Sequence, residues 1–295
     1  MTTNQQRLLP TIALLVAIVL WGSSFVVMKY SFQEIEPLLI IFGRLVVASL
    51  CFLPFLKAFV KLPVTRKHIF LLLIMGLCEP CFYFLFEAAA LQHTTASQAS
   101  MITTMLPMLV AIVAGMFLGE HISKKTVCGF FVAAGGAIWL SLSSHKTELA
   151  PNPVWGNFLE FMAMVCATGY ITLCKYLSRD LPSLFLTGVQ SFCGALFFLL
   201  VVLFLGITLP EKISVSSILV IVYLGLFVSF GAYGLYNFGV SHIPVSQASA
   251  FINLIPVTTL ILGYLVLGER LTIWQIPACT LVLMGVLLSQ DRHAS

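Results

Sequence analysis

The chain alternates long apolar runs with short polar breaks. Ten runs each hold about 20 mostly apolar residues, the length that a helix needs to cross the hydrocarbon core of a bilayer. They lie at residues 10–29, 37–59, 68–91, 96–117, 124–143, 154–177, 181–206, 215–238, 244–266 and 273–290. The runs are continuous rather than alternating in steps of two, which favours helices over the strands of a barrel. Because backbone polar groups in lipid must be satisfied internally, the pattern predicts an all-α polytopic membrane protein with ten transmembrane helices.

The few polar positions within these runs show that one segment of the sequence is repeated. Residues 97–107 read SQASMITTMLP, and residues 246–256, which lie 149 positions later, read SQASAFINLIP. Thirteen residues after each proline the chain reads LGE, ending at Glu120 and at Glu269. Both glutamates precede residues suited to begin a helix, so we expect them to belong to turns and caps rather than to a substrate site.

Weaker matches extend the repeat over nearly the whole chain. The sequence WGSSFVVMKY at 21–30 aligns with ATGYITLCKY at 167–176. We therefore expect two five-helix repeats, residues 10–143 and 154–290, joined by a polar linker. Since five is an odd number, the second repeat must enter the membrane from the opposite side, which makes the repeats inverted. Inverted repeats are typical of secondary transporters, although channels have them too.

Charge sets the expected orientation in the membrane. Only 9% of the 295 residues are charged and 60% are apolar, whereas an ordinary globular chain is roughly 25% charged. Ten of the 15 Lys and Arg residues lie on the N-terminal side of the predicted helices, four lie on the other side, and Arg44 lies inside the second helix. The positive-inside rule then predicts that both termini are cytoplasmic. This asymmetry accounts for the net charge of +4, so no nucleic-acid partner is needed.

The first run does not have the features of a cleavable signal peptide. Only Arg7 precedes it, its apolar stretch is long, and no small-x-small cleavage site follows it. We expect a multi-pass protein of the plasma membrane, most simply a bacterial inner membrane, that needs the lipid bilayer and a small-molecule substrate as partners. Nothing in the sequence requires a second copy, so a monomer is compatible with it.

Motifs for other kinds of chemistry are absent from the sequence. Cys78 and Cys81 form a CxxC pair, but no second pair completes the four ligands of a structural zinc site, so we expect no metal. There is no P-loop for ATP and no HExxH or GxSxG motif, and we expect no cofactor. Two alternatives to transport remain open. One is an intramembrane enzyme that uses Glu79, Glu87 and His93 as acids or bases, and the other is a membrane scaffold.

Three ionisable residues lie in one layer of the predicted bundle. Arg44, Glu87 and Glu160 each lie a few residues inside the same end of their helices, which places them roughly 6–10 Å deep. Charged groups inside a membrane are costly and often functional. We expect Arg44 to pair with Glu87 or Glu160, because an unpaired buried charge is destabilising. The pair is either purely structural or a gate that opens during transport, and a direct contact with substrate is the alternative.

Glu79 occupies a different position, at the middle of the third helix beside Pro80. No basic residue lies at its depth, and burial disfavours the charged form of a carboxyl group. Glu79 is therefore our candidate for proton coupling, and it also suits a substrate amine. The alternative is a neutral carboxylic acid that only forms a hydrogen bond with a neighbouring helix.

The duplicated element brings polar side chains from both repeats to one depth. Thr104 and Asn253 are equivalent residues, and each precedes a proline, Pro107 or Pro256, by three positions. Each proline removes a backbone hydrogen bond and weakens the helix near mid-membrane. Met101 and Phe251, which lie in this element of the first and second repeat, are candidates for an apolar cavity wall, with core packing as the alternative.

These motifs resemble those of the EamA-type drug/metabolite transporters. The resemblance rests on WGSS…K in the first helix, P…FGR in the second and the twofold SQAS…P…LGE, and it covers nearly the whole chain as two tandem modules. It implies a ten-helix bundle with a central cavity and export of small metabolites, often amino acids. The residues on the helices that would surround this cavity are candidates for substrate binding, with helix packing as the alternative: Trp21, Phe25, Tyr83, Tyr170, Tyr233, Tyr236 and Asn237. The second repeat has Gln190 near the place of Arg44, so a symmetric pair of arginines is excluded.

Overall fold

The computed structural model describes residues 3–117, 124–208, 210 and 213–289. Within these ranges the regular structure is helical throughout. The first half of the chain forms α1 (Thr3–Ser31), α2 (Pro37–Phe52), η1 (Leu53–Phe55), α3 (Leu56–Phe59), α4 (Arg66–Gly76), η2 (Leu77–Phe82), α5 (Tyr83–His93), α6 (Ala96–Thr103), α7 (Leu106–Phe117) and α8 (Lys124–Leu142). The second half forms α9 (Pro153–Leu177), α10 (Ser183–Phe204), α11 (Val215–Tyr223), η3 (Leu224–Ala232), α12 (Tyr233–His242), α13 (Val245–Ala250), η4 (Phe251–Leu254), α14 (Ile255–Leu267) and α15 (Gln275–Ser289).

Several of these elements join into longer helices that can cross a membrane. Among the described residues, eight continuous helical stretches are long and apolar enough to do so, and two further apolar stretches, Val127–Leu142 and Gln275–Gly285, are shorter. The predicted all-α membrane class is therefore confirmed. The count of ten transmembrane helices and the inversion of the repeats stay predictions, as do the repeat boundaries.

The long helices are interrupted near their middles where the sequence contains proline. The third run breaks at Glu79, whose backbone is extended (φ −149°, ψ 122°), as expected for a residue whose α conformation is disfavoured by the following proline. The fourth run breaks between α6 and α7, just before Pro107, and the ninth passes through η4 just before Pro256. The weakening predicted at these two prolines is confirmed.

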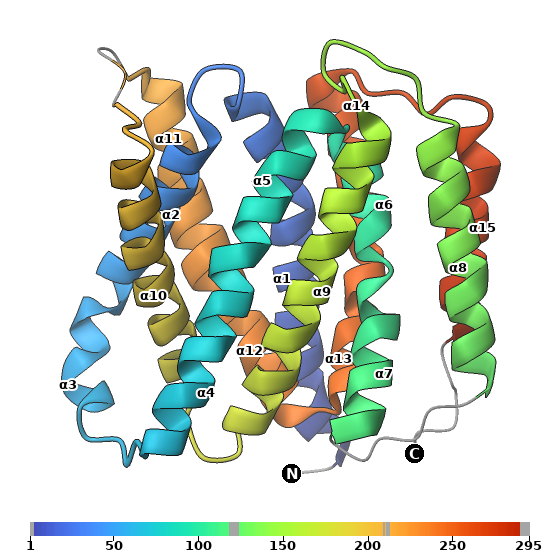
Figure 1. The fold of residues 1–295 in the computed structure, drawn as a ribbon. Coiled ribbons are helices and arrows are strands. Elements are labelled where there is room, and N and C mark those ends of the chain that lie inside the picture. The colour runs from blue at the N-terminus through green and yellow to red at the C-terminus, as the bar shows by residue number, and fades with distance from the viewer. Residues whose placement is uncertain (1–2, 118–123, 209, 211–212, 290–295) are drawn as a thin grey trace.

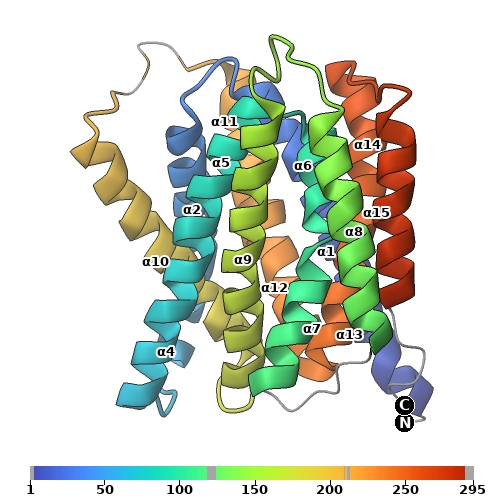
Figure 2. The same cartoon turned by 45° about the vertical axis from the view of Figure 1, so that its right-hand side comes forward.

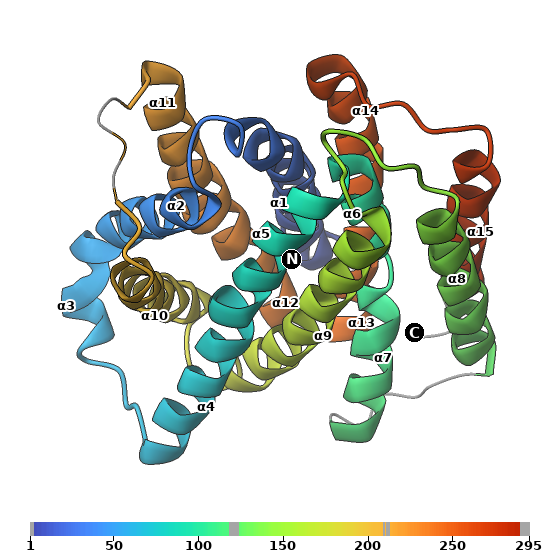
Figure 3. The same ribbon diagram turned by 45° about the horizontal axis from the view of Figure 1, so that its top comes forward.

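The helices stand side by side in one bundle (Figure 1). Helices α8 and α15 pack along each other at one edge, which Figures 1 and 2 both show. In Figure 3, α2, α10 and α11 are grouped at the opposite edge, and α1, α5 and α9 lie between the two groups. In this middle region the most extensive contacts between helices are those of α5 with α9 and of α1 with α12 and α14. First-half and second-half helices are thus packed against each other at the centre of the protein.

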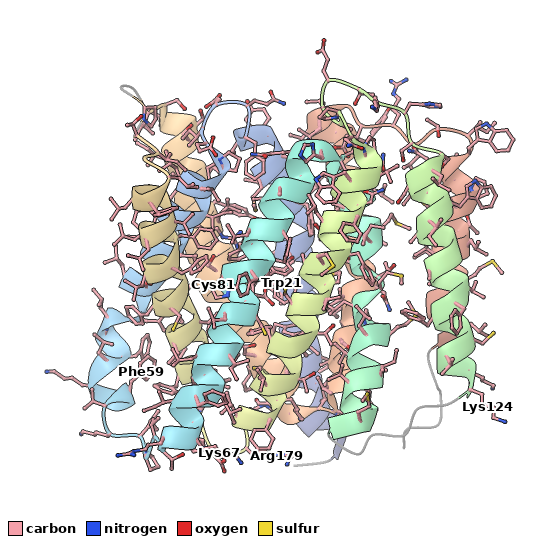
Figure 4. All side chains as sticks on the ribbon, in the orientation of Figure 1. Trp21, Phe59, Lys67, Cys81, Lys124 and Arg179 are labelled. Atoms are coloured by element: carbon pink, nitrogen blue, oxygen red, sulfur yellow. The ribbon has the colours of Figure 1, made fainter. Side chains whose placement is uncertain are left out.

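The two ends of the bundle can be told apart by their loops. We call the end that carries the α8–α9 loop, residues 143–152, the linker face; it is at the top of Figure 1. The opposite end carries the turn between α9 and α10. Figure 4 shows Lys67, Lys124 and Arg179 together at this opposite end and Trp21 at mid-height. Basic side chains therefore gather at the end where the charge count places them, although the side of the membrane that this end faces is not shown by the structure.

Candidate functional site

A cavity lies at mid-depth where the two halves of the chain meet. Its volume is about 30 Å³, enough for about one or two water molecules. Its lining residues come from helices of both halves: Trp21, Ser24, Phe25, Arg44, Glu79, Tyr83, Phe84, Glu87, Thr103, Leu106, Met164, Ala167, Tyr170, Ile171, Tyr233, Ile252 and Ile255. The cavity therefore has room for water and not for a metabolite in the conformation described here.

Several lining residues are equivalent positions of the two repeats. Thr103 and Ile252, which are 149 residues apart, both line the cavity, and so do Leu106 and Ile255. The weaker repeat, with its spacing of 146 residues, supplies three more lining pairs: Trp21 with Ala167, Ser24 with Tyr170, and Phe25 with Ile171. The cavity thus lies where equivalent segments of the two repeats face each other.

Glu79 reaches the cavity from the break between α4 and α5. Its carboxylate accepts a hydrogen bond from the Tyr233 hydroxyl of α12, and the residue is 4% exposed. The ring of Tyr233 lies 5.0 Å from that of Trp21 and 6.2 Å from that of Tyr170. An acid from one half is therefore held by a hydroxyl from the other half, within a wall of aromatic rings.

Arg44 is buried on α2, with 1% of its surface exposed. Its Nε donates to the Ser229 hydroxyl at 2.8 Å, and its guanidinium carbon lies 4.6 Å from the centre of the Phe84 ring. A terminal nitrogen lies 3.3 Å from the sulfur of Met28. A guanidinium group has five N–H donors, so these contacts leave donors available toward the cavity that Arg44 lines.

The ion pair expected for Arg44 is not formed in this conformation. In the part of the chain that the structure describes, the one ion pair joins His68 to Asp180 at 3.3 Å. Glu87 instead accepts a hydrogen bond from the Tyr83 hydroxyl at 2.8 Å. A stacked ring and a serine hydroxyl replace the carboxylate as partners of Arg44, so a gate that pairs Arg44 with a glutamate stays a prediction about another conformation.

Six of the predicted site residues do not line the cavity. They are Met101, Thr104, Asn237, Phe251, Asn253 and Glu160. The Met101 side chain packs with Leu140 and Val282 of α8 and α15, and the Thr104 hydroxyl turns back to the Met101 carbonyl at 2.7 Å. Phe251 packs against the main core. Both repeats contribute to the cavity one residue earlier than predicted, through Thr103 and Ile252, because the helices break at this point.

Asn237 does not line the cavity but bonds to a residue that does. Its carbonyl oxygen accepts a hydrogen bond from the Tyr170 hydroxyl, and its amide donates to Thr187 at 2.9 Å. It therefore fixes the orientation of a tyrosine that does line the cavity. Tyr236 stacks on Trp21 with a centroid distance of 4.7 Å, and its hydroxyl is buried without a hydrogen-bond partner among the described residues. The two amide atoms of Asn253 are in the same situation.

The prediction from sequence missed nine lining residues: Ser24, Phe84, Thr103, Leu106, Met164, Ala167, Ile171, Ile252 and Ile255. Most are apolar and have no chemical signal of their own. The repeat was the signal that could have found three of them, because the predicted residues Trp21, Phe25 and Tyr170 have Ala167, Ile171 and Ser24 as their equivalents.

The turn at Glu269 has the predicted capping role, but its helix belongs to the other repeat. The Glu269 carboxylate accepts hydrogen bonds from the backbone N–H groups of Ala96, at 2.8 Å, and Ser97, at 2.9 Å. These are free donors at the start of α6, where a negative charge is favourable. The equivalent residue Glu120 lies outside the described residues. Among the residues described, no three His, Cys, Asp or Glu side chains are grouped to hold a metal ion.

Comparisons with known proteins agree with this architecture. The profile of the EamA-like transporter family matches residues 8–142 and again 154–290. An uncharacterized transporter of Bacillus subtilis, YetK, is 29% identical over 267 residues, which cover 88% of this chain and 79% of YetK. An uncharacterized transporter of Archaeoglobus fulgidus is 26% identical over 93% of this chain and 96% of its own.

Two further matches extend this picture. The WAT1-related chloroplastic protein At3g02690 of Arabidopsis thaliana is 24% identical, with 91% of this chain and 66% of that protein covered. A solved crystal structure superimposes with a TM-score of 0.68 at 18% identity, and the superposition covers 97% of this chain and 96% of the other. At that identity the likeness establishes the fold alone.

Proposed function

The chain belongs to the EamA-like transporter family, and from this premise we propose that it is a secondary active transporter that exports small metabolites by alternating access. The observation that carries the proposal is the mid-depth cavity, built from equivalent positions of both repeats and lined by Arg44 and Glu79. Transporters with inverted repeats place their substrate near the bilayer midplane at the interface between the repeats. The family gives the class of protein, and the cavity suggests the mode of action.

The chemistry of the cavity favours amino acids or related compounds as substrates. Arg44 offers N–H donors that suit a carboxylate, and Glu79 offers an acceptor that suits an ammonium group. The aromatic rings of Trp21, Tyr170 and Tyr233 also line the cavity. They offer apolar surface to a side chain of the substrate and cation–π contacts to its ammonium group. One cavity therefore presents partners for both charged ends of a zwitterion and for an apolar side chain.

Alternating access requires two conformations that open toward opposite faces. The broken helices supply the flexible points, because backbone hydrogen bonds are interrupted at Glu79, before Pro107 and before Pro256. We propose ten transmembrane helices in two inverted five-helix repeats, so that each half repeats the movement of the other in the opposite direction. The conformation with a cavity of about 30 Å³ is then an intermediate that is closed at its centre.

We propose that protons drive export and that Glu79 carries them. Glu79 lies in the cavity, so a substrate amine and a proton compete for the same carboxylate. This competition couples the release of one to the binding of the other. On this proposal the protein resides in a bacterial inner membrane with both termini in the cytoplasm.

Reconstitution into liposomes tests the proposal directly. Purified protein in proteoliposomes should move labelled amino acids, and an imposed pH gradient should drive this movement against the concentration gradient. Empty liposomes are the background, and a mixture of radiolabelled amino acids is the first probe. A parallel screen asks which toxic amino-acid analogue cells tolerate when they overexpress the protein. If no member of either set is transported or tolerated, the proposed substrate class is wrong.

A further inference from the structure

We propose that Glu87 and Glu160 form a second proton-binding site, separate from Glu79, at the interface between α5 and α9. The inference rests on the proposed function only where it assigns the site a part in coupling, because proton binding itself is measured without transport. The two carboxyl groups belong to different halves of the chain, and the structure gives neither of them an ion-pair partner among the described residues.

The packing of α5 on α9 places the two glutamates opposite each other. Near the linker face the helices touch backbone to backbone, since a methyl group added at Gly156 would lie 2.9 Å from the Ala90 carbonyl oxygen. The helices run in opposite directions from this contact. One helical turn toward the membrane centre leads from Ala90 to Glu87 and from Gly156 to Glu160. This register places the two glutamates at the same level of the α5–α9 interface.

The oxygens of this pair are buried and mostly without partners. Glu160 is 0% exposed, and neither of its carboxyl oxygens has a hydrogen-bond partner among the residues described. Glu87 is 3% exposed, and its Oε2 is likewise without one, while Oε1 accepts from Tyr83. Three buried, unsatisfied carboxyl oxygens in one place need protons or a cation, because an isolated ionised carboxylate in a dry environment is very costly. A proton shared between the two carboxyl groups removes one negative charge and satisfies two of the three oxygens.

The charged and titratable groups around the pair are consistent with one bound proton. Tyr83 donates a hydrogen bond to Glu87, and Arg44 of α2, Tyr233 of α12 and Glu79 line the same cavity as Glu87. When Glu79 is neutral, Arg44 balances one carboxylate charge, so the arrangement is neutral when exactly one of Glu87 and Glu160 is protonated. The site then gains and returns one proton, and only O–H bonds form and break.

Contacts on both sides of the pair connect it to the cavity and to the linker face. Toward the cavity, Tyr83 lies one turn from Glu87 on α5 and lines the cavity itself. Toward the linker face, Asn157 lies one turn from Glu160 and bonds to Thr94, at 2.8 Å, and to Ser141, at 2.9 Å. This polar network continues through Gln98 and Ser144 to Gln275 at the start of α15. The pair thus reaches from the central cavity, which Glu87 lines, toward the polar network on the side of the linker face.

Infrared spectroscopy tests the site in the purified full-length protein. A protonated carboxylic acid has a C=O stretch that is distinct from the carboxylate bands and shifts in D₂O. We expect such a band in the wild type and in Glu79→Gln, and we expect it to fall in both Glu87→Gln and Glu160→Gln. Glu148→Gln is the matched control, because Glu148 is exposed in the α8–α9 loop and its loss should leave the band unchanged.

Several outcomes would overturn the proposal. If Glu79→Gln leaves no protonated-acid band at neutral pH, the pair holds no proton, and this result does not depend on whether the Glu160 variant folds. If Glu87→Gln and Glu160→Gln each leave the band unchanged, the proton lies elsewhere. Counting protons with a pH indicator during an alkaline jump gives a second readout: the double variant should release one proton fewer than the wild type.

Transport then separates this inference from the proposed function. In proteoliposomes loaded with labelled amino acids, Glu160→Gln should lose flux driven by a pH gradient and keep exchange of labelled for unlabelled substrate. A wild type that transports without any band from the pair refutes the second site alone. A wild type that shows the band but transports no amino acid refutes the proposed substrate class and leaves the proton site standing.

Discussion

Lys29 and Lys175, which are equivalent residues of the two repeats, each donate hydrogen bonds to the last carbonyl groups of an equivalent helix. Lys29 bonds to the Leu91 carbonyl and, at 2.9 Å, to that of Thr94, at the end of α5. Lys175 bonds to the carbonyls of Val240, at 2.8 Å, and Ile243, at 2.7 Å, at the end of α12. Val240 and Ile243 lie 149 residues after Leu91 and Thr94.

The two lysines lie at opposite ends of the bundle. Lys29 also bonds to the Leu149 carbonyl in the α8–α9 loop of the linker face, whereas Lys175 lies just before the α9–α10 turn at the other end (Figure 1). A cation is favourable at the C-terminal end of a helix, where the carbonyl groups lack intrahelical donors. The same capping contact at opposite faces is what inverted repeats would produce, and it supports that proposal.

These caps predict a loss of stability. Lys29→Ala removes three charge-assisted hydrogen bonds from buried carbonyls and should destabilise the protein by about 2 kcal/mol. The expected result is a lower melting temperature in detergent, with Lys175→Ala behaving similarly. Lys61→Ala, which changes an exposed lysine, is the control and should melt with the wild type. Equal melting of all four proteins would show that the caps do not contribute to stability.

The orientation of the chain predicts the sides on which its parts are found. A reporter fused after Ser295 should be cytoplasmic, because most Lys and Arg residues lie on the side assigned to the termini. A reporter inserted beside Glu148 should be on the outside. A topology reporter of the glycosylation or phosphatase type, fused at each position in turn, shows on which side of the membrane that position lies. Signals from the same side would contradict an odd number of helices in each repeat, and with it the inversion.

Glu79 predicts a separation of two kinds of flux. Glu79→Gln keeps the size of the side chain and its bond to Tyr233 but cannot carry a proton, so the protein should fold. Uphill flux driven by a pH gradient should be lost. Substrate–substrate exchange, which needs no proton release, should continue with weaker substrate binding, because an amide replaces the carboxylate that faces the amine. Loss of both fluxes would show that Glu79 is essential for binding the amine and would leave proton coupling unsupported. Wild-type behaviour in both assays would assign Glu79 a structural role only.

Tyr233→Phe is the companion variant for this experiment. It removes the hydroxyl that donates to Glu79 but leaves the aromatic wall in place. Because the hydrogen bond favours the ionised carboxylate, we expect the pH profile of gradient-driven flux to move toward higher pH in this variant. A profile identical to that of the wild type would show that the contact does not influence the proton at Glu79.

Arg44 predicts a rescue by a second substitution. Arg44→Ala removes the one basic side chain among the described residues that line the cavity, together with its contacts to Ser229 and Phe84. This loss should cost on the order of 3 kcal/mol. Glu87→Gln in the same chain removes a carboxylate that Arg44 faces and should restore part of the lost melting temperature. Arg44→Ala with Ser229→Ala is the control and should restore nothing. Equal melting of the two double variants would exclude an energetic coupling between Arg44 and Glu87.

Gly22 predicts a steric effect between α1 and α14. A methyl group added at Gly22 would lie 2.6 Å from Cβ of Thr258, which is too close for two carbon atoms. Gly22→Ala should therefore push the helices apart, with a cost of about 1–3 kcal/mol. Gly234→Ala is the matched control, since no atom lies within 4 Å of the methyl group it would add. Melting in detergent distinguishes them, and unchanged melting of Gly22→Ala would show that α1 and α14 can separate freely.

The all-helical membrane fold could be predicted because it depends on the length of apolar runs alone. Much of the cavity could be predicted too. Glu79 is an ionisable residue inside a membrane helix, Trp21 and Tyr233 lie on helices that the family resemblance places around a cavity, and all three line it. Polar residues in a lipid-spanning segment must find a protein environment, and this restricts where they can point.

The remaining errors have local causes. Thr104 and Asn253 were expected in the cavity, but the helix breaks before Pro107 and Pro256 turn the preceding residues, Thr103 and Ile252, toward it. The partner of Arg44 was expected to be a carboxylate. Sequence gives the depth of Arg44 and not its direction around the helix axis, and that direction brings it to Ser229 and Phe84.

The small volume of the central cavity has an electrical consequence. With about 30 Å³ open at mid-depth, water there is limited to about one or two molecules. An ion that entered this cavity would lose most of its hydration shell, which is costly. In this conformation the cavity therefore opposes the leakage of ions, and with it the loss of membrane voltage.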